Sequence, residues 1–76
     1  MEVSFEKDYK LLGLNISYYR RLRGLTQAQL AEKIYISHSY LRKIECGNYH
    51  KSVSLTTIMA IAHGLDVKID KLLSSK

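Results

Sequence analysis

The side chains best suited to chemistry lie between positions 37 and 45, where polar and basic residues recur one helical turn apart. They are His38, Ser39, Arg42 and Lys43. The apolar Leu41 and Ile44 fall at the complementary spacing, so one helix would bury these two and expose the others. Such a face can hydrogen-bond to base edges in the major groove, where lysine and arginine donate to guanine. A solvated polar face is the plainer alternative.

Residue types that enzymes and metal sites use lack the grouping that such chemistry requires. His38, His50 and His63 show no metal-ligand spacing with one another or with Cys46. No glycine-rich phosphate loop and no serine or cysteine nucleophile motif is present. We therefore expect no enzyme activity, no metal, no cofactor and no small-molecule ligand.

Charge favours a polyanionic partner. The net charge is +5 and the sequence pI is about 9.5. The excess lies between positions 20 and 51, where seven basic residues face only Glu32 and Glu45. The seven are Arg20, Arg21, Arg23, Lys33, Arg42, Lys43 and Lys51.

The compartment is predicted from features that are missing. A single cysteine excludes an internal disulfide, and no apolar run is long enough to cross a membrane. The first residues are too acidic for a signal peptide. We expect a cytoplasmic protein.

The elements that position these residues are predicted to be all helical, since the chain has no proline and four glycines. We expect an arm over 1–7 and a single domain over 8–76. Asp8 would cap a first helix ending near Arg23 and Gly24, with Gly13 inside it at a possible close helix contact. Thr26 and Gln29 form a capping box for the second helix. Ser37 would cap the third helix.

Two further helices complete the predicted domain. Ser54 would cap the fourth, with Leu55, Ile58, Ile61 and Ala62 facing the core, and Gly64 would end it. A short fifth helix would carry Leu72 and Leu73.

An ordered series of motifs resembles the phage-repressor and Cro-like helix-turn-helix domains, the XRE family. The series is 24–27 (GLTQ), 30–33 (LAEK), 36–41 (ISHSYL), 43–45 (KIE), 54–55 (SL) and 62–67 (AHGLDV). The resemblance covers about residues 11 to 73. It implies a compact five-helix, lambda-repressor-like fold in which helices 2 and 3 form the helix-turn-helix. It also implies operator binding, usually as a dimer.

The resemblance implies roles for individual residues. Helix 3 would enter the major groove, with His38, Ser39, Arg42 and Lys43 as base-reading candidates. The candidates for phosphate contacts are Gln27, Ser37, Tyr40, Asn48, Tyr49, His50 and Lys51, with Tyr40 expected to combine packing with phosphate contact. Arg20 is expected to pair with Glu45 and not to touch DNA, while Arg21 and Arg23 would approach phosphates or face solvent.

Two positions depart from the family pattern. Tyr35 occupies the turn position where glycine is common, and a tyrosine with positive φ costs roughly 1–2 kcal/mol. Either the turn is rebuilt or the strain is tolerated. Lys68 stands where a capping serine or aspartate is common, which predicts a short or frayed last helix.

The sequence therefore favours a bacterial or phage-encoded, nucleoid-associated regulator that binds double-stranded DNA as a homodimer. The dimer surface would lie near Leu65, Val67, Ile69, Leu72 and Leu73. The alternative is an antitoxin-like or adaptor domain that uses the same fold to bind another protein.

Overall fold

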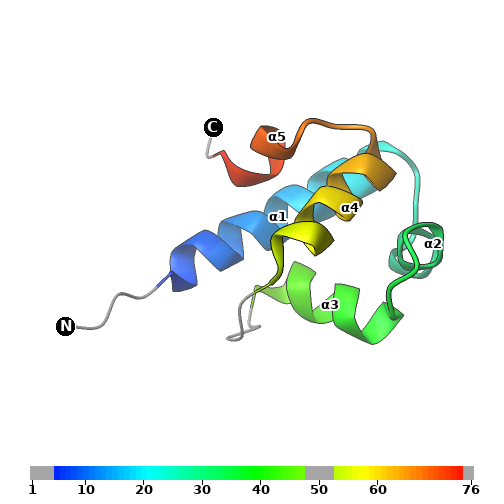
Figure 1. The fold of residues 1–76 in the computed structure, drawn as a ribbon, viewed down its shortest axis with the longest axis horizontal. Coiled ribbons are helices and arrows are strands. Elements are labelled where there is room, and N and C mark those ends of the chain that lie inside the picture. Colours follow the sequence, from blue (N-terminus) through cyan, green and yellow to red (C-terminus); the bar gives the residue numbers. More distant parts are fainter. Residues whose placement is uncertain (1–4, 48–52, 75–76) are drawn as a thin grey trace.

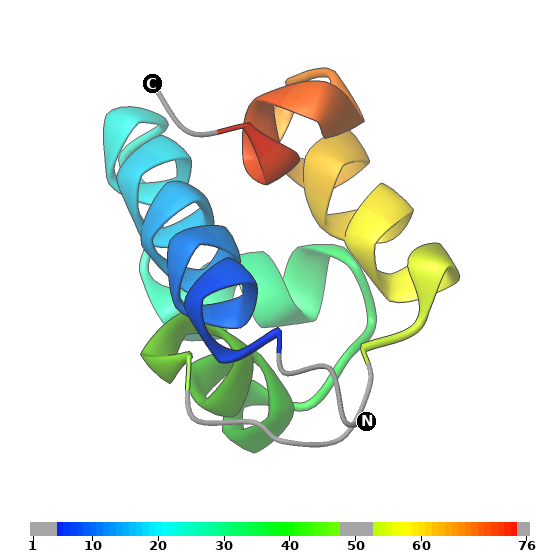
Figure 2. The ribbon, with the colours of Figure 1, turned by 90° about the vertical axis from the view of Figure 1, so that its left-hand side faces the viewer.

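The computed structural model describes residues 5–47 and 53–74, which form five α-helices and no strand (Figure 1). The helices are α1 (Glu6–Leu22), α2 (Gln27–Lys33), α3 (His38–Cys46), α4 (Leu55–Leu65) and α5 (Ile69–Leu73). Seen from the end of α1, α4 and α5 stack beside that helix while α3 lies beneath it (Figure 2). The predicted all-α, five-helix fold is confirmed.

Three helix starts depend on side chains that the sequence marks. Thr26 Oγ1 accepts from the N–H of Gln29, and Gln29 Oε1 accepts from the N–H of Thr26, which completes the capping box. Ser37 and Ser54 begin α3 and α4 by accepting hydrogen bonds from N–H groups of the first turn. These caps satisfy donors that have no partner inside the helix.

The start of α1 differs from the prediction. The helix begins at Glu6, and its N-cap residue Phe5 makes no side-chain capping bond. Asp8 lies within the first turn, so its predicted role as the cap is wrong. A carboxylate there interacts favourably with the positive end of the helix through its charge alone.

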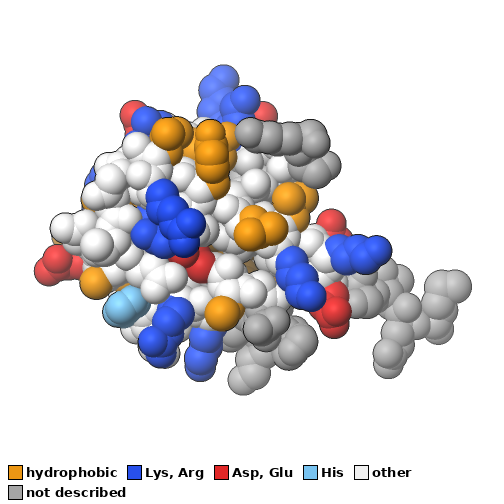
Figure 3. Space-filling view, turned by 180° about the vertical axis from the view of Figure 1, so that it is seen from behind, with side chains coloured by type: hydrophobic (Ala, Val, Ile, Leu, Met, Phe, Trp, Pro, Cys, Tyr) orange, Lys and Arg blue, Asp and Glu red, His pale blue; other side chains and the backbone are white. Residues whose placement is uncertain are grey.

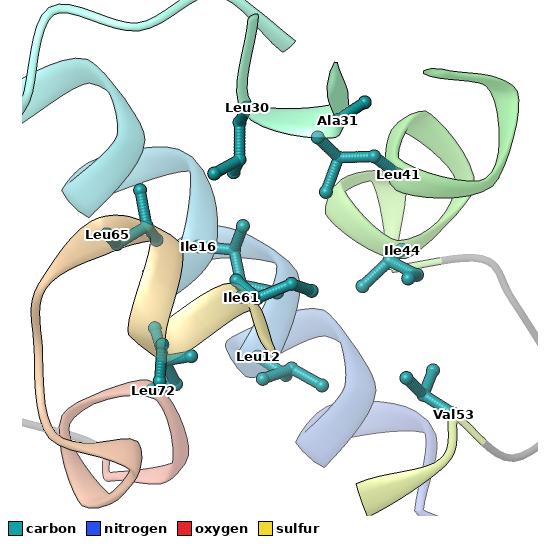
Figure 4. Close-up of a cluster of buried hydrophobic side chains, with 11 residues drawn as sticks. Leu12, Ile16, Leu30, Ala31, Leu41, Ile44, Val53, Ile61, Leu65 and Leu72 are labelled. Carbon is teal, nitrogen blue, oxygen red and sulfur yellow. The ribbon is translucent and has the colours of Figure 1, made fainter. Parts of the chain in front are cut away.

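One contiguous apolar core holds the helices together (Figure 4). Leu55, predicted to face this core, is 61% exposed at the first position of α4, and Val53, two residues earlier, is buried instead. The core residues are Leu12, Ile16, Leu30, Ala31, Leu41, Ile44, Val53, Ile61, Ala62, Leu65 and Leu72.

Gly13 permits the close approach of α1 to α3 that the sequence suggested. A Cβ atom at this position would lie 2.5 Å from the carbonyl oxygen of Glu45 and 2.7 Å from that of Ile44. Only a residue without a side chain allows the two backbones to approach this closely. The contact sets the position of α3 relative to the scaffold.

The end of α4 also differs from the prediction. Gly64 lies inside the helix, and the left-handed residue that ends it is Asp66, with φ 57°. A Cβ on Gly64 would lie 2.5 Å from Ile34 Cγ2, so a side chain here would force Ile34, at the C-terminal end of α2, to move. Aspartate tolerates the left-handed region better than most residues, which is why no glycine is needed at the end.

The last helix is short, as the uncapped Lys68 predicted. It has five residues, and Lys68 makes no side-chain capping bond. Asn15 of α1 donates to the carbonyl oxygens of Leu72 (2.9 Å) and Ser74 (3.0 Å), which fastens the C-terminal end of α5. Over residues 5–47 and 53–74, no helix has the length and apolar character needed to cross a bilayer.

Candidate nucleic-acid interface

The α2–α3 unit contains a tight turn in which Tyr35 is left-handed, with φ 61°. The turn keeps its hydrogen bonds, from Tyr35 N to Glu32 O (3.3 Å) and from Ile36 N to Ala31 O (3.0 Å). The Tyr35 side chain is 95% exposed. The strain is therefore tolerated and the turn is not rebuilt.

The third helix divides into two faces as its periodicity predicted. Leu41 and Ile44 are 0% and 2% exposed and anchor the inner face. The four base-reading candidates, His38, Ser39, Arg42 and Lys43, are all exposed. Seen from behind, Lys and Arg side chains and a histidine gather along the lower edge of the molecule, where α3 lies (Figure 3).

The phosphate candidates differ in how much the structure says of them. Tyr40 is half-buried and packs against the core, which agrees with the packing part of its predicted role. Ser37 is exposed at the start of α3, and its hydroxyl is engaged in capping. Asn48, Tyr49, His50 and Lys51 lie outside the described residues.

Arg20 and Glu45 form the ion pair that the resemblance implied. Arg20 Nε donates to Glu45 Oε2 at 2.7 Å, and Nη2 donates to Oε1 at 3.1 Å. The two side chains are only 9% and 5% exposed. Arg20 Nη1 also donates to the carbonyl oxygen of Leu25 at 2.8 Å, so this arginine ties α1 to α3 and to the start of α2.

Gln27 and His38 extend this pair toward the exposed face of α3. Gln27 Nε2 lies 3.1 Å from Glu45 Oε1, and Gln27 Oε1 lies 3.3 Å from His38 Nε2. The sequence analysis missed this connection, because its members are 11 and 18 positions apart and no local pattern links them. The sequence offered only an indirect signal, namely a glutamine at the first position of the second helix in a chain where the resemblance already implied the Arg20–Glu45 pair.

Arg23 and Lys33, two of the basic residues between positions 20 and 51, are also hydrogen-bonded to the protein's own backbone. Arg23 donates from Nε to the carbonyl oxygen of Leu65 (2.7 Å) and from Nη2 to that of Asp66 (3.1 Å). Lys33 Nζ donates to the carbonyl oxygen of Gly64 at 2.9 Å. Both cations thus hold the C-terminal end of α4, where carbonyl groups and the helix dipole favour positive charge. The predicted alternatives for Arg23, phosphate contact or plain solvent exposure, both omitted this role.

An open surface depression lies where the end of α1 meets the starts of α2 and α3. Two arginines and the first residues of α2 line it. Its lining residues are Arg20, Arg21, Gly24, Leu25, Thr26, Gln27, Ala28 and His38. Because Arg20 is engaged with Glu45, Arg21 is the arginine of this rim that remains exposed.

No group of three or more His, Cys, Asp or Glu side chains suited to a metal ion occurs in the described part of the chain. Cys46 is a free, exposed thiol at the end of α3.

The fold and this surface together define a helix-turn-helix DNA-binding domain. A family model described as helix-turn-helix matches residues 16–72, and the chain belongs to that family. The resemblance to phage repressors is confirmed: the immunity repressor protein of Bacillus phage phi105 is 38% identical over 65 residues. That match covers 86% of this chain and 44% of the phage protein, so the chain spans less than half of that relative's length.

Solved structures agree. The restriction-modification controller protein C.AhdI from Aeromonas hydrophila superimposes with a TM-score of 0.79 at 30% identity, covering 87% of this chain and 97% of that one. SinR, a master regulator for biofilm formation solved in complex with DNA, gives a TM-score of 0.76 at 33% identity. The SinR match covers 83% of this chain and 98% of that one.

Proposed function

We propose that this protein is a transcriptional regulator that binds a specific double-stranded DNA site by inserting α3 into the major groove. The observation that carries the proposal is the division of α3 into a buried face and an exposed face of hydrogen-bonding side chains. The SinR structure in complex with DNA has the same fold and supports this use of it.

In this arrangement His38, Ser39, Arg42 and Lys43 read base edges. Lysine and arginine suit guanine N7 and O6, and the first helical turn approaches the bases in this class of motif. Ser37, Tyr40 and the loop residues Asn48, Tyr49, His50 and Lys51 remain our candidates for phosphate contacts.

Phosphate binding is also proposed at the start of α2. Arg21 and Gln27 line the depression described above, and an exposed arginine beside a helix start favours an anion. The Gln27 amide donates one hydrogen to Glu45 and carries a second one, which would be available to the phosphate.

The function is tested by selecting bound duplexes from a random pool and measuring their affinity as salt increases. We expect one enriched sequence and a steep fall in affinity with salt. Each phosphate contact should contribute about −0.9 to the slope of log binding constant against log salt concentration. Weak binding that ignores sequence would refute the proposal and favour the adaptor alternative.

Two charge-matched variants sharpen this test. Lys43→Ala removes a cation from α3, and Lys71→Ala removes one from the exposed surface of α5, on the opposite side of the molecule (Figure 1). We expect only the first to reduce affinity for the selected duplex. Equal losses would mean that net charge alone drives the binding.

We also propose that the protein acts as a homodimer. Leu65 and Leu72 are buried in the core, so a dimer surface near α5 would use the half-buried Val67 and Ile69 and the exposed Leu73. Leu73→Asp should dissociate the dimer in sedimentation experiments. Leu14→Asp, at an exposed leucine of α1, is the control. If the wild-type protein is monomeric both free in solution and bound to DNA, this part of the proposal is refuted.

A further inference from the structure

The hydrogen bonds that run from Arg20 to His38 have a fixed direction. An arginine guanidinium has only donors, and Arg20 directs two of them at Glu45. The Glu45 carboxylate can only accept, so the Gln27 amide must present its NH2 group to Glu45. This requirement determines which way the amide of Gln27 is turned.

The orientation of Gln27 determines which nitrogen of His38 carries a hydrogen. With its NH2 group toward Glu45, Gln27 presents Oε1, a pure acceptor, to His38 Nε2 at 3.3 Å. His38 Nε2 must therefore donate. In the neutral ring the other nitrogen, Nδ1, then carries a lone pair and acts as an acceptor.

We infer that Gln27 is a positioning residue that makes neutral His38 an acceptor toward DNA, so that His38 selects a base with an exocyclic amine. The inference rests on the proposed function. In the major groove only cytosine N4 and adenine N6 donate hydrogen bonds, whereas guanine N7 and O6 and thymine O4 accept. His38 is exposed in the first turn of α3, the part of a recognition helix that comes near the bases.

The same arrangement also disfavours guanine and thymine. A guanine or thymine opposite Nδ1 would bring two acceptors together, and neither could be satisfied. The choice of base at this position thus depends on Glu45, two hydrogen bonds away, because its carboxylate fixes the orientation of the Gln27 amide.

The first test reads the histidine ring directly, without DNA. Nitrogen-15 spectra at alkaline pH, where imidazoles are neutral, should place the hydrogen of His38 on Nε2 and leave Nδ1 bare. Gln27→Met keeps the size of the side chain and removes its amide, and should shift both nitrogen signals toward a mixture of tautomers. A hydrogen on Nδ1 in the wild type, or identical spectra for the variant, would overturn the inference.

A second variant shows whether the effect of Gln27→Met comes from the lost acceptor or from a disturbed fold. Gln27→Lys keeps a donor for Glu45 and removes the acceptor that faces His38. It should give the same mixed spectrum while Arg20 and Glu45 stay paired. Melting curves for both variants establish that they are folded.

The second test uses DNA with single functional groups removed. His38→Ala first identifies the base pair whose preference depends on this residue. Removing the amine there, with purine for adenine or 2-pyrimidinone for cytosine, should cost roughly tenfold in affinity, about one hydrogen bond. Gln27→Met should reduce the same preference.

Replacing N7 by carbon in the purine of that pair should have little effect. If the N7 deletion is costly and the amine deletion is not, or if His38→Ala changes no position, the inference is wrong. Failure of the wild type to select any sequence would instead refute the proposed function, and the spectra would still report the tautomer.

Discussion

Glu45→Ala removes the carboxylate that joins α3 to α1, and we expect it to destabilise the domain by about 3 kcal/mol. The change removes three hydrogen bonds, two from Arg20 and one from Gln27. It also leaves a guanidinium that is 9% exposed with only its bond to Leu25. Desolvated charges that lose their partner are costly, whereas the intact pair itself contributes little.

For a domain of this size, about 3 kcal/mol corresponds to a fall in melting temperature of roughly 12–24 °C. Circular dichroism during heating and in urea measures both quantities. Glu32→Ala, which removes an exposed carboxylate from α2 away from the helix start, is the control for net charge and should change stability by less than about 0.5 kcal/mol.

A double-mutant cycle separates the pair from its surroundings. Arg20→Met should also destabilise, and the double variant should be less damaging than the sum of the two, with a coupling of about 2 kcal/mol. If Glu45→Ala costs less than about 1 kcal/mol, or if the two effects simply add, the pair does not hold the helices as argued.

Further predictions concern the turn, the α1–α3 contact and base reading. Tyr35→Gly should raise the melting temperature by a few degrees, because relief of roughly 1–2 kcal/mol of left-handed strain at this exposed position exceeds the entropy that glycine adds to the unfolded chain. A clearly lower melting temperature would mean that the turn is unstrained. Gly13→Ala should destabilise by roughly 1–3 kcal/mol in urea titrations, since its methyl group would meet the carbonyl oxygens of α3, and a neutral result would show that the helices separate freely. The double variant His38→Ala with Lys43→Ala should keep the wild-type melting curve and lose discrimination between selected and random duplexes in binding assays; normal discrimination would exclude α3 as the reader.

The sequence was sufficient to predict features that depend on local spacing. The caps at Thr26, Ser37 and Ser54 were predictable because each satisfies amides within three residues of itself. The faces of α3 followed from the helical period. The Arg20–Glu45 pair was predicted from the family resemblance, since nothing local relates residues 25 positions apart.

Features that depend on tertiary packing were not predictable in this way. Gly64 resembled a helix end, but it is needed inside α4 because Ile34 occupies the space where its side chain would lie. Arg23 and Lys33 were indistinguishable by charge from DNA-binding residues until the end of α4 was placed beside them. The orientation of Gln27 likewise depends on three helices at once.

The attachment of Arg23 and Lys33 to the end of α4 limits how this protein could be engineered or could evolve. By charge alone, many basic residues are candidates for substitutions that weaken or strengthen DNA binding. At these two, however, a neutral replacement would also remove hydrogen bonds to the carbonyl groups at the C-terminal end of α4, so any change in affinity would come with some loss of stability. Among the described basic residues between positions 20 and 47, Arg20, Arg23 and Lys33 are bonded to the scaffold, so Arg21, Arg42 and Lys43 are the ones whose exchange should change DNA affinity with the least effect on stability.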